Sequence, residues 1–320
     1  PERKDLMRAV TIEPEGVLAI REHPDPVAGV GEVLVRVRAA GLNFADTLQR
    51  VGGYPAPPGS PEDIPGLELA GEVVATGQYA DRFTIGDRVM GVVGGDGQGE
   101  LLAVHERQLM PVPDSLSWEQ AGAFSEAFLT AHDAVFRQGK LRPGERLLIN
   151  GASGGVGTAA IQIAALAGAE VIASVRNPAN CQWLIELGAT AAIDPSDVAT
   201  NGPYDVVLEL VGAANFEEDL DVLADWGRIV IIGLITGAHA KLNLGKLLNK
   251  RATISGSTLR SRPLELKAQA TRVVEREVLP AVAAGRITVP ISAIYPMDEV
   301  TAAYDSFHGG GKLGKIVLML

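Results

Sequence analysis

One glycine-rich heptapeptide, GASGGVG at residues 151–157, constrains the fold more than any other stretch of the chain. Apolar patterning without helix breakers predicts three elements around it: a strand at 146–150, a helix at 156–167 and a second strand at 169–175. Strand, glycine turn, helix and strand form the context of a dinucleotide-binding fingerprint. Residues without side chains let the backbone approach a pyrophosphate, and the amides that open the helix carry partial positive charge toward it. In the register of G-x-G-x-x-G, Ala152 takes the first glycine position, so a merely tight strand–helix turn is the alternative.

The two parts of the chain have different patterns. Residues 8–114 are rich in short strands and turns, and they indicate a small irregular barrel. From residue 115 onward, strands and helices alternate in the rhythm of a parallel sheet with helices on both faces. The last strand is expected to return to the first domain, because it would otherwise leave a bare apolar edge. The predicted strands are 32–39, 71–76, 86–91, 191–193, 205–210, 228–232, 252–255 and 316–319, and the predicted helices begin at Ser117 and span 126–136, 179–187, 216–223 and 264–284.

Composition excludes several classes of function. Of the 320 residues 47% are hydrophobic, enough for sizeable cores, but no apolar run reaches membrane-spanning length and no secretory signal is present. The net charge of −11 argues against a nucleic-acid-binding surface, which needs concentrated Lys and Arg. The single cysteine, Cys181, excludes an internal disulfide and fits a reducing cytoplasm. Met7 is expected to mark the natural start, with residues 1–6 as a leader or an extension.

The end of the second strand indicates which dinucleotide is bound. An acidic residue there would hydrogen-bond a ribose 2′-hydroxyl, but this chain has Ser174, Arg176 and Asn177 in that region and no carboxylate. The guanidinium fork of Arg176 suits a 2′-phosphate. The sequence therefore predicts NADP(H) rather than NAD(H), and the alternative is that Arg176 is only a solvated loop residue.

Two later strand ends are expected to line the same crevice, because ligands of parallel sheets sit beyond the carboxyl ends of the strands. One is 209–212, which includes Val211, and the other is 232–235, which comprises Ile232, Gly233, Leu234 and Ile235. Glycines there would let the backbone pass close to the ribose and nicotinamide. Ordinary strand-to-loop glycines are the alternative.

Several motifs, in order along the chain, resemble the zeta-crystallin-like quinone oxidoreductases of the medium-chain dehydrogenase/reductase superfamily. They are AGLNFAD at 40–46 followed by GYP at 53–55, PGLELAGEV at 65–73, the fingerprint with its trailing TAAIQIA at 158–164, and GKIVL at 314–318. The segments SEAFLTA at 125–131 and GSTLRSR at 256–262 resemble the branch that includes the tumour-suppressor-induced quinone oxidoreductase of animals. The resemblance runs from Met7 to the last residue.

This resemblance implies an α/β chain in which a Rossmann domain is inserted into a barrel-like, GroES-like catalytic domain. The implied domains are 7–122, 123–263 and a return to the catalytic domain at 264–320. It also implies NADPH in the cleft between the domains, reduction of quinones and usually a homodimer. Many members hold the 2′-phosphate with a lysine after the second strand, whereas 177–180 here read NPAN, which leaves Arg176 more of that role. Carried over by position, cofactor contacts fall on Asn43, Thr130, Ser153, Gly154, Gly155, Val156, Ser174, Arg176, Gly233, Leu234, Ser257, Leu259 and Arg260.

No metal site is expected. A catalytic zinc needs about three ligands from Cys, His or carboxylate, and the zinc-dependent members of the superfamily present a Cys near Asn43 and a His where Leu67 stands. The five histidines of this chain are scattered without ligand spacing.

The chemistry that remains suits a quinone. An alcohol–ketone reaction would lack its usual Lewis acid, whereas hydride attack on a quinone gives a delocalised hydroquinone anion. Asn43, Asp46 and Tyr54 are the polar residues predicted to line that pocket: Tyr54 as a hydrogen-bond or proton donor to a quinone oxygen, Asn43 as a holder of ribose or substrate, and Asp46 as a group that orients either one. The alternatives are that Asn43 and Asp46 cap the following helix and that Tyr54 packs against the proline-rich loop.

The leading prediction is thus a zinc-independent NADPH:quinone reductase. The nearest alternative is an NADPH-dependent reductase of activated C=C bonds in enals, enones or enoyl thioesters. A non-catalytic NADPH-binding, structural or RNA-binding protein is the alternative from another class, and the acidic balance counts against RNA.

Overall fold

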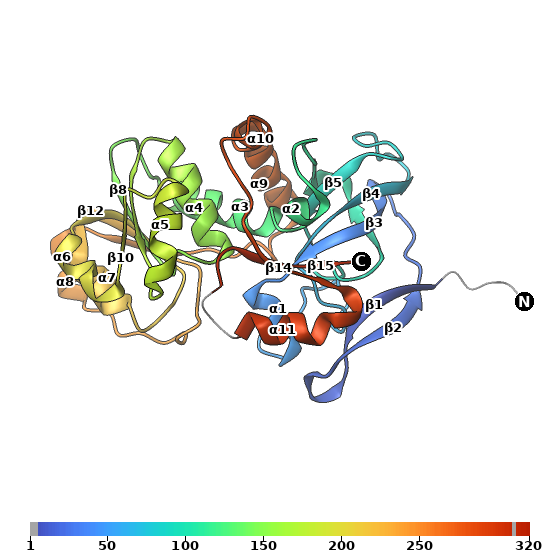
Figure 1. Cartoon of the computed structure of the whole chain (residues 1–320), viewed down its shortest axis with the longest axis horizontal. Coiled ribbons are helices and arrows are strands. Elements are labelled where there is room, and N and C mark those ends of the chain that lie inside the picture. The colour runs from blue at the N-terminus through green and yellow to red at the C-terminus, as the bar shows by residue number, and fades with distance from the viewer. Residues whose placement is uncertain (1–5, 309–311) are drawn as a thin grey trace, which may run out of the picture. The chain divides into compact units, whose positions relative to one another are not determined.

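The computed structural model describes residues 6–308 and 312–320, so the expectation of a leader at residues 1–6 lies almost wholly outside the described residues. The chain divides into two compact units (Figure 1). The first, here called the barrel unit, comprises the residues up to Glu126 and those from Leu259 onward; the second, the Rossmann unit, comprises Ala127–Thr258. One unit contains a mostly antiparallel β-sheet and the other a parallel sheet with helices, which confirms the predicted fold class.

The barrel unit is built on a seven-stranded sheet. Its strand order is β14-β15-β3-β4-β5-β7, and β6 also pairs with β3. Alternate residues of β3 (Val33, Val35 and Val37) are buried and pack with Leu69 and Leu109, because successive side chains of a strand point to opposite faces. The strands are β3 (Glu32–Gly41), β4 (Glu68–Thr76), β5 (Arg88–Val92), β6 (Leu101–His105), β7 (Leu109–Pro111), β14 (Ile291–Pro296) and β15 (Lys315–Met319), and a separate ribbon pairs β1 (Leu6–Ile12) with β2 (Leu18–Pro24).

The two ends of the chain meet in this sheet. Strand β15 pairs antiparallel with β3, with Val317 opposite Gly41, so the last strand returns to the first unit as expected. Helix α11 (Val300–His308), drawn in red in Figure 1, packs against β14 and β15. Leu42 is buried in the same cluster as Tyr304 of α11. The other helices of the unit are α1 (Phe44–Arg50), α2 (Trp118–Gly122), α9 (Leu264–Glu277) and α10 (Leu279–Ala283).

The capping box that starts α2 was predicted correctly, but the single helix predicted at 264–284 was wrong. Ser117 and Gln120 form the capping box that starts α2, as predicted. The helix predicted at 264–284 is two helices, because Pro280 has no N–H to continue the backbone ladder and its ring crowds the preceding turn. Helix α9 ends at Glu277 and α10 starts at Leu279.

The Rossmann unit contains a six-stranded parallel sheet in the order β10-β9-β8-β11-β12-β13. The chain runs from β8 toward one edge and then returns to the other side of β8, which is the point where ligands bind in such sheets. Leu148, Ile172, Val207 and Ile229 form its core. The strands are β8 (Arg146–Asn150), β9 (Glu170–Ser174), β10 (Ala191–Ile193), β11 (Tyr204–Glu209), β12 (Leu223–Ile231) and β13 (Thr253–Gly256).

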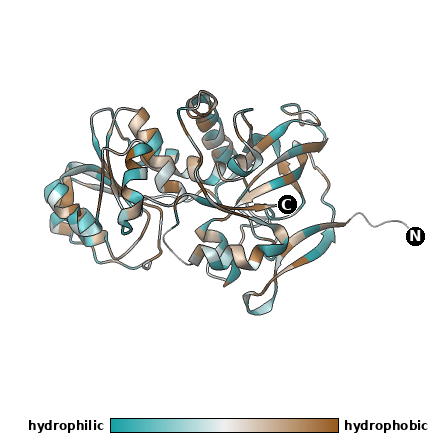
Figure 2. Cartoon of the chain, viewed as in Figure 1, coloured by the Kyte–Doolittle hydropathy of each residue, from teal (hydrophilic) through white to brown (hydrophobic). Residues whose placement is uncertain are grey.

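Helix α3 (Ser125–His132) begins two residues before the first residue of the Rossmann unit. The other helices of this unit are α4 (Gly155–Leu166), α5 (Cys181–Glu186), α6 (Val198–Asn201), α7 (Phe216–Val222) and α8 (Leu244–Lys250). Small side chains let α4 lie with most of its length buried. Figure 2 shows that α7 and α8 carry both hydrophilic and hydrophobic residues. The helix predicted at 126–136 ends at His132 and continues as a π-helical turn, Asp133–Gln138. None of the helices in the described part of the chain is long and apolar enough to cross a membrane.

Candidate functional site

The glycine-rich stretch forms a tight turn between β8 and α4. Gly151 has a φ of 78°, a left-handed conformation that favours glycine, and the Ala152 N–H donates to the Ser174 carbonyl at 3.2 Å. A Cβ on Gly157 would lie 2.4 Å from the Ala152 oxygen, so only glycine lets the helix pack this closely on the turn. By contrast, a Cβ on Gly154 would meet nothing nearer than 4.0 Å, so the outer side of the turn is open.

The mouth of α4 is suited to an anion. The Thr158 N–H donates to the Gly154 carbonyl at 2.9 Å, and this is the first hydrogen bond of the helix. The amides of 155–157 therefore have no acceptor within the helix. With the helix dipole behind them, these amides fit the pyrophosphate of a dinucleotide.

Strand β9 brings Ser174 and Arg176 beside this turn. Asn150, the last residue of β8, is opposite Ser174 in the sheet register, and Arg176 follows two residues later. Arg176 is exposed and makes no ion pair or hydrogen bond with any other residue in 6–308 or 312–320. Asn177, in contrast, caps a short 3-10 turn by accepting the Ala179 N–H at 3.1 Å.

The ends of β11 and β12 lie at the same edge of the sheet. A Cβ on Gly233 would lie 1.9 Å from the Leu210 oxygen, so close approach of two backbones requires glycine there. Leu234 and Ile235 are 48% and 60% exposed. The structure thus brings the following predicted cofactor residues of the Rossmann unit to the carboxyl edge of one sheet: Ser153, Gly154, Gly155, Val156, Ser174, Arg176, Asn177, Val211, Gly233, Leu234 and Ile235.

The remaining predicted cofactor residues are distributed over both units. Ser257 follows β13, and its hydroxyl lies 2.5 Å from Asp133 Oδ2 of the π-helical turn. Thr130 is a buried residue of α3. Leu259, which is buried, and Arg260 belong to the barrel unit, as does Asn43.

A buried acidic pair lies at the carboxyl edge of the sheet, and sequence reasoning missed it. Asn150 Nδ2 donates to Glu209 Oε2 at 2.8 Å and to Asp219 Oδ1 at 2.7 Å, and both acids are 1% exposed. Glu209 also accepts the backbone N–H groups of Val211 and Gly212, which fixes the loop after β11. Burial and the neighbouring Glu209 raise the pKa of Asp219 to about 9, so Asp219 is protonated at neutral pH.

In the barrel unit, Asn43 is held by three neighbours. Its Nδ2 donates to Glu68 Oε1 at 3.0 Å and to the Gly41 carbonyl at 3.2 Å, and its Oδ1 accepts from Lys315 Nζ at 2.5 Å. Lys315 in turn lies 2.6 Å from Glu68 Oε1. The amide of Asn43 therefore ties the ends of three strands together.

Asp46 has the capping contacts that the sequence left open as an alternative. It is completely buried, and its carboxylate accepts the Asn43 N–H at 2.8 Å and the Gly66 N–H at 3.1 Å. Burial raises its pKa to about 6, against the opposing effects of the Asn43 hydrogen bond and the positive charges of Lys315 and Arg260.

Tyr54 and Arg260 lie together. The Arg260 guanidinium lies 5.3 Å from the centroid of the Tyr54 ring, and its Nη1 donates to the Tyr54 carbonyl at 3.1 Å. Arg260 is 2% exposed. The structure thus gathers Asn43, Asp46 and Tyr54 with Arg260 in one polar region of the barrel unit, since both Lys315 and Arg260 act on Asp46.

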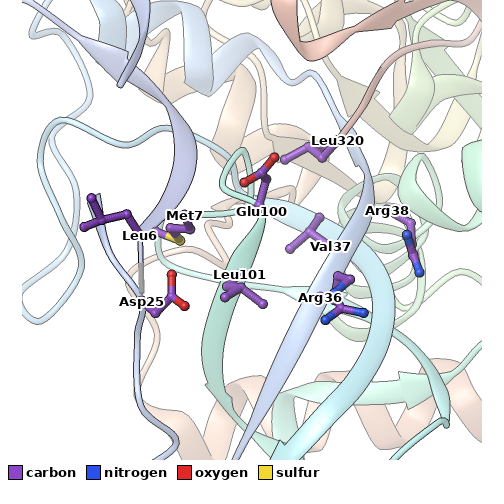
Figure 3. A pocket seen from close by; sticks show the side chains of 9 residues that line it. All are labelled: Leu6, Met7, Asp25, Arg36, Val37, Arg38, Glu100, Leu101 and Leu320. Carbon is purple, nitrogen blue, oxygen red and sulfur yellow. The ribbon is translucent and has the colours of Figure 1, made fainter. Parts of the chain in front are cut away.

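The described part of the chain has no metal cluster, and a cavity in the barrel unit does not include the predicted site residues. No group of three or more His, Cys, Asp or Glu in 6–308 and 312–320 is arranged to hold a metal ion. A cavity of about 280 Å³ lies elsewhere in the barrel unit and contains none of the predicted site residues. Figure 3 shows Arg36, Arg38 and Glu100 among the residues that line it.

Comparisons with known proteins cover both units. Residues 29–140 match the family model described as alcohol dehydrogenase GroES-like domain, and 155–276 match the one described as zinc-binding dehydrogenase. The chain is 34% identical over 317 residues to a quinone oxidoreductase of Pseudomonas aeruginosa, covering 95% of each chain. It is 29% identical over 333 residues to the quinone oxidoreductase of Mus musculus, covering 98% of each. Among solved structures, a quinone oxidoreductase of Pseudomonas syringae superposes with a TM-score of 0.86 at 32% identity, covering 98% of this chain and 100% of that one.

Proposed function

The chain belongs to the zeta-crystallin-like quinone oxidoreductase family, and from this membership and the dinucleotide cradle we propose that it transfers hydride from NADPH to a quinone. It is a nicotinamide-dependent oxidoreductase. The observation that carries the proposal is the open turn at Gly154, where unpaired amides at the mouth of α4 face the switch point of the sheet.

Arg176 supports NADPH as the dinucleotide. It stands at the end of β9, where an acid would select the 2′-hydroxyl of NADH, and no other described residue neutralises it. Charge-assisted hydrogen bonds contribute about 1.5–3 kcal/mol, so Arg176→Ala should weaken NADPH binding by roughly 10- to 100-fold and leave NADH binding nearly unchanged. Fluorescence titration of both dinucleotides measures this, with Arg142→Ala as a control at an exposed residue that precedes the amino end of β8. Equal losses for both dinucleotides would remove Arg176 from cofactor selection.

The chain's own groups would divide the work as follows. NADPH, when bound, would supply the hydride. The amides of 155–157 would hold its pyrophosphate, and the exposed Leu234 and Ile235, which follow β12, lie at the edge of the sheet where the ribose and nicotinamide would run. The Tyr54 hydroxyl donates a hydrogen bond or proton to a quinone oxygen. Asn43 and Asp46 hold the strand ends and the start of α1 from which the substrate pocket is built.

We also propose that the reaction needs no zinc. Asn43 and Leu67 stand where zinc-dependent members of the superfamily place Cys and His. The side-chain oxygen of Asn43 accepts a hydrogen bond from the ammonium group of Lys315. The family model described as zinc-binding covers 155–276, where the described residues offer no clustered metal ligands. Full activity after dialysis against a chelator is the expected result, and loss of activity that zinc restores would contradict it.

We also propose that the protein is a homodimer in the cytoplasm. Strand β13 is an edge strand of the Rossmann sheet, and Leu244 and Leu248 of nearby α8 are 63% and 75% exposed. Such an edge with apolar neighbours favours pairing with a second copy, and the lone Cys181 suits a reducing compartment. Light scattering after size exclusion would give twice the chain mass.

The decisive assay is oxidation of NADPH and NADH against ortho-quinones, para-quinones and a 2-alkenal. Fast NADPH oxidation with quinones supports the proposal, whereas a preference for the alkenal would favour reduction of C=C bonds. Tight NADPH binding without oxidation by any acceptor would indicate a non-catalytic protein.

A further inference from the structure

The barrel unit buries two cations near Asp46, and an ion pair neutralises only one of them. Lys315 Nζ lies 2.6 Å from Glu68 Oε1, and both side chains are nearly inaccessible. Arg260 is equally buried, at 2% exposure, yet no carboxylate of the described chain lies within ion-pair distance of it. Burying an unpaired charge costs free energy. The Arg260 guanidinium therefore needs either partners that stabilise its charge or a function that uses it.

The hydrogen-bond acceptors that surround the Arg260 guanidinium are uncharged. Its Nε donates to the Gly94 carbonyl at 2.7 Å, Nη1 to the Tyr54 carbonyl at 3.1 Å and Nη2 to Gln49 Oε1 at 2.5 Å. These three acceptors satisfy donors of the guanidinium fork but bring no negative charge. The positive charge of Arg260 therefore persists in a region of low dielectric, where charges act strongly.

The charged groups around Arg260 act on it from beyond ion-pair distance. Asp46, Glu126 and Tyr54 act on Arg260 electrostatically, and Arg260 in turn lowers the pKa of Lys267, whose burial is the larger cause. Asp46 directs its two carboxylate oxygens at backbone N–H groups rather than at the guanidinium. Burial of Arg260 lowers its own pKa from a very high ordinary value, so it stays charged.

The same guanidinium positions Tyr54. It holds the Tyr54 carbonyl and lies 5.3 Å from the ring centroid, in the geometry of a cation–π contact. It also holds Gly94, so it fixes two loops that are 40 residues apart in the sequence. The ring of the proposed proton donor is thus fixed by a cation that forms no ion pair within the described chain.

We infer that Arg260 is a positioning residue for the reduction: it fixes the Tyr54 phenol and supplies a positive charge behind it that favours the acceptor oxygen as an anion. This inference rests on the function proposed above. Quinone plus NADPH plus one proton gives hydroquinone plus NADP⁺. The hydride brings two electrons and one hydrogen, which leaves a hydroquinone monoanion until the second proton arrives from Tyr54 or water. A fixed charge aimed at that oxyanion stabilises the transition state that leads to it.

Gln49→Glu separates the charge of Arg260 from its positioning contacts. A carboxylate in place of the Gln49 amide, whose Oε1 lies 2.5 Å from Arg260 Nη2, would keep this hydrogen bond and offset the positive charge of the guanidinium, with loss of the hydrogen bond that Gln49 Nε2 donates to the Glu62 carbonyl. The readout is binding of 4-nitrophenolate to the NADP⁺-loaded protein, by absorbance at a pH where the probe is ionised, with uncharged 4-nitroanisole as the neutral ligand. We expect the dissociation constant of the phenolate to rise at least tenfold and that of the anisole to stay unchanged. Gln78→Glu adds the same charge at an exposed position of the same unit and should change neither.

The positioning half is tested by combining Arg260→Met with Tyr54→Phe. If Arg260 acts in part through Tyr54, the double variant loses less kcat/KM for quinone than the two single losses combined, and Arg260→Lys restores part of the loss. Wild-type phenolate binding in Gln49→Glu, or independent additive losses in the double variant, would overturn the role of Arg260 while quinone reduction by the wild type still stands. Absence of quinone reduction in the wild type would instead overturn the proposed function.

Discussion

Replacing the buried carboxyl of Asp46 tests whether burial or hydrogen bonding dominates its pKa. The pKa in turn sets how the stability of the barrel unit changes with pH. Asp46 is completely buried, and two backbone N–H groups stabilise its charged form. Burial still dominates and raises its pKa from 3.8 to about 6. The folded state therefore binds this proton more tightly than the unfolded state, so the stability contributed by Asp46 is full below about pH 4 and is lost as the pH rises through 6.

The size of the effect follows from the pKa shift. A shift from 3.8 to about 6 corresponds to about 3 kcal/mol at about 1.4 kcal/mol per pH unit. Asp46→Asn removes the titration, so the wild type should lose about 3 kcal/mol relative to the variant between pH 4 and pH 7, and nothing more above that. For a domain of this size, that corresponds to roughly 6–12 °C in the difference of melting temperatures.

Urea unfolding of both proteins from pH 4 to pH 8 measures this difference. Asp87→Asn is the matched control, because Asp87 also accepts a backbone N–H, from Thr84, but outside the core. A difference between wild type and Asp46→Asn that does not change with pH would refute the reasoning. A wild type that gains stability relative to the variant with rising pH would show that the two N–H groups outweigh burial.

Three further predictions concern the Rossmann unit. Burial beside Glu209 raises the pKa of Asp219 from 3.8 to about 9, so the folded state holds this proton more tightly than the unfolded state; Asp219→Asn should therefore gain stability over the wild type as the pH rises from about 4 to about 9 and no more above that, measured by urea unfolding. Gly233→Ala should unfold or strongly destabilise the unit, because its Cβ would lie 1.9 Å from a backbone oxygen, whereas Gly256→Ala, with 3.7 Å of room, should melt near the wild-type temperature. Gly154→Ala should keep the wild-type melting temperature but weaken NADPH about tenfold in a fluorescence titration, because its Cβ meets no protein atom nearer than 4.0 Å and points into the open turn.

The fold class and most elements could be predicted because their signals are local. The alternation of residues 32–39 specifies a half-buried strand, and the glycines of 151–157 with the breaker-free segment that follows specify a turn and a helix. Helix boundaries were less predictable. The helix after Leu264 has apolar periodicity on both sides of Pro280, and this one residue, through its missing N–H and its ring, ends the helix early.

The buried acid pair could not be predicted, because nothing in the sequence near Glu209 or Asp219 signals a shared environment. The two acids become neighbours because β8 and β11 are adjacent in the sheet, which places Asn150 opposite Glu209. Asn150 then bridges both carboxyls. Such coupling depends on strand order, which is a long-range property of the fold.

At the candidate site, the surroundings of Arg260 also could not be predicted from the sequence. The motif GSTLRSR identifies it as a residue of the family, but its three acceptors lie 166 to 211 residues away in the sequence. Whether its charge is felt at Tyr54 depends on the residue at 49, where an amide leaves the guanidinium charged and a carboxylate would neutralise it. Gln and Glu are nearly identical in shape and in helix propensity, so the formation of α1 does not distinguish them. They differ only in the assembled cluster, where Glu would bring a negative charge beside Arg260 and would lose the hydrogen bond that Gln49 Nε2 donates to the Glu62 carbonyl.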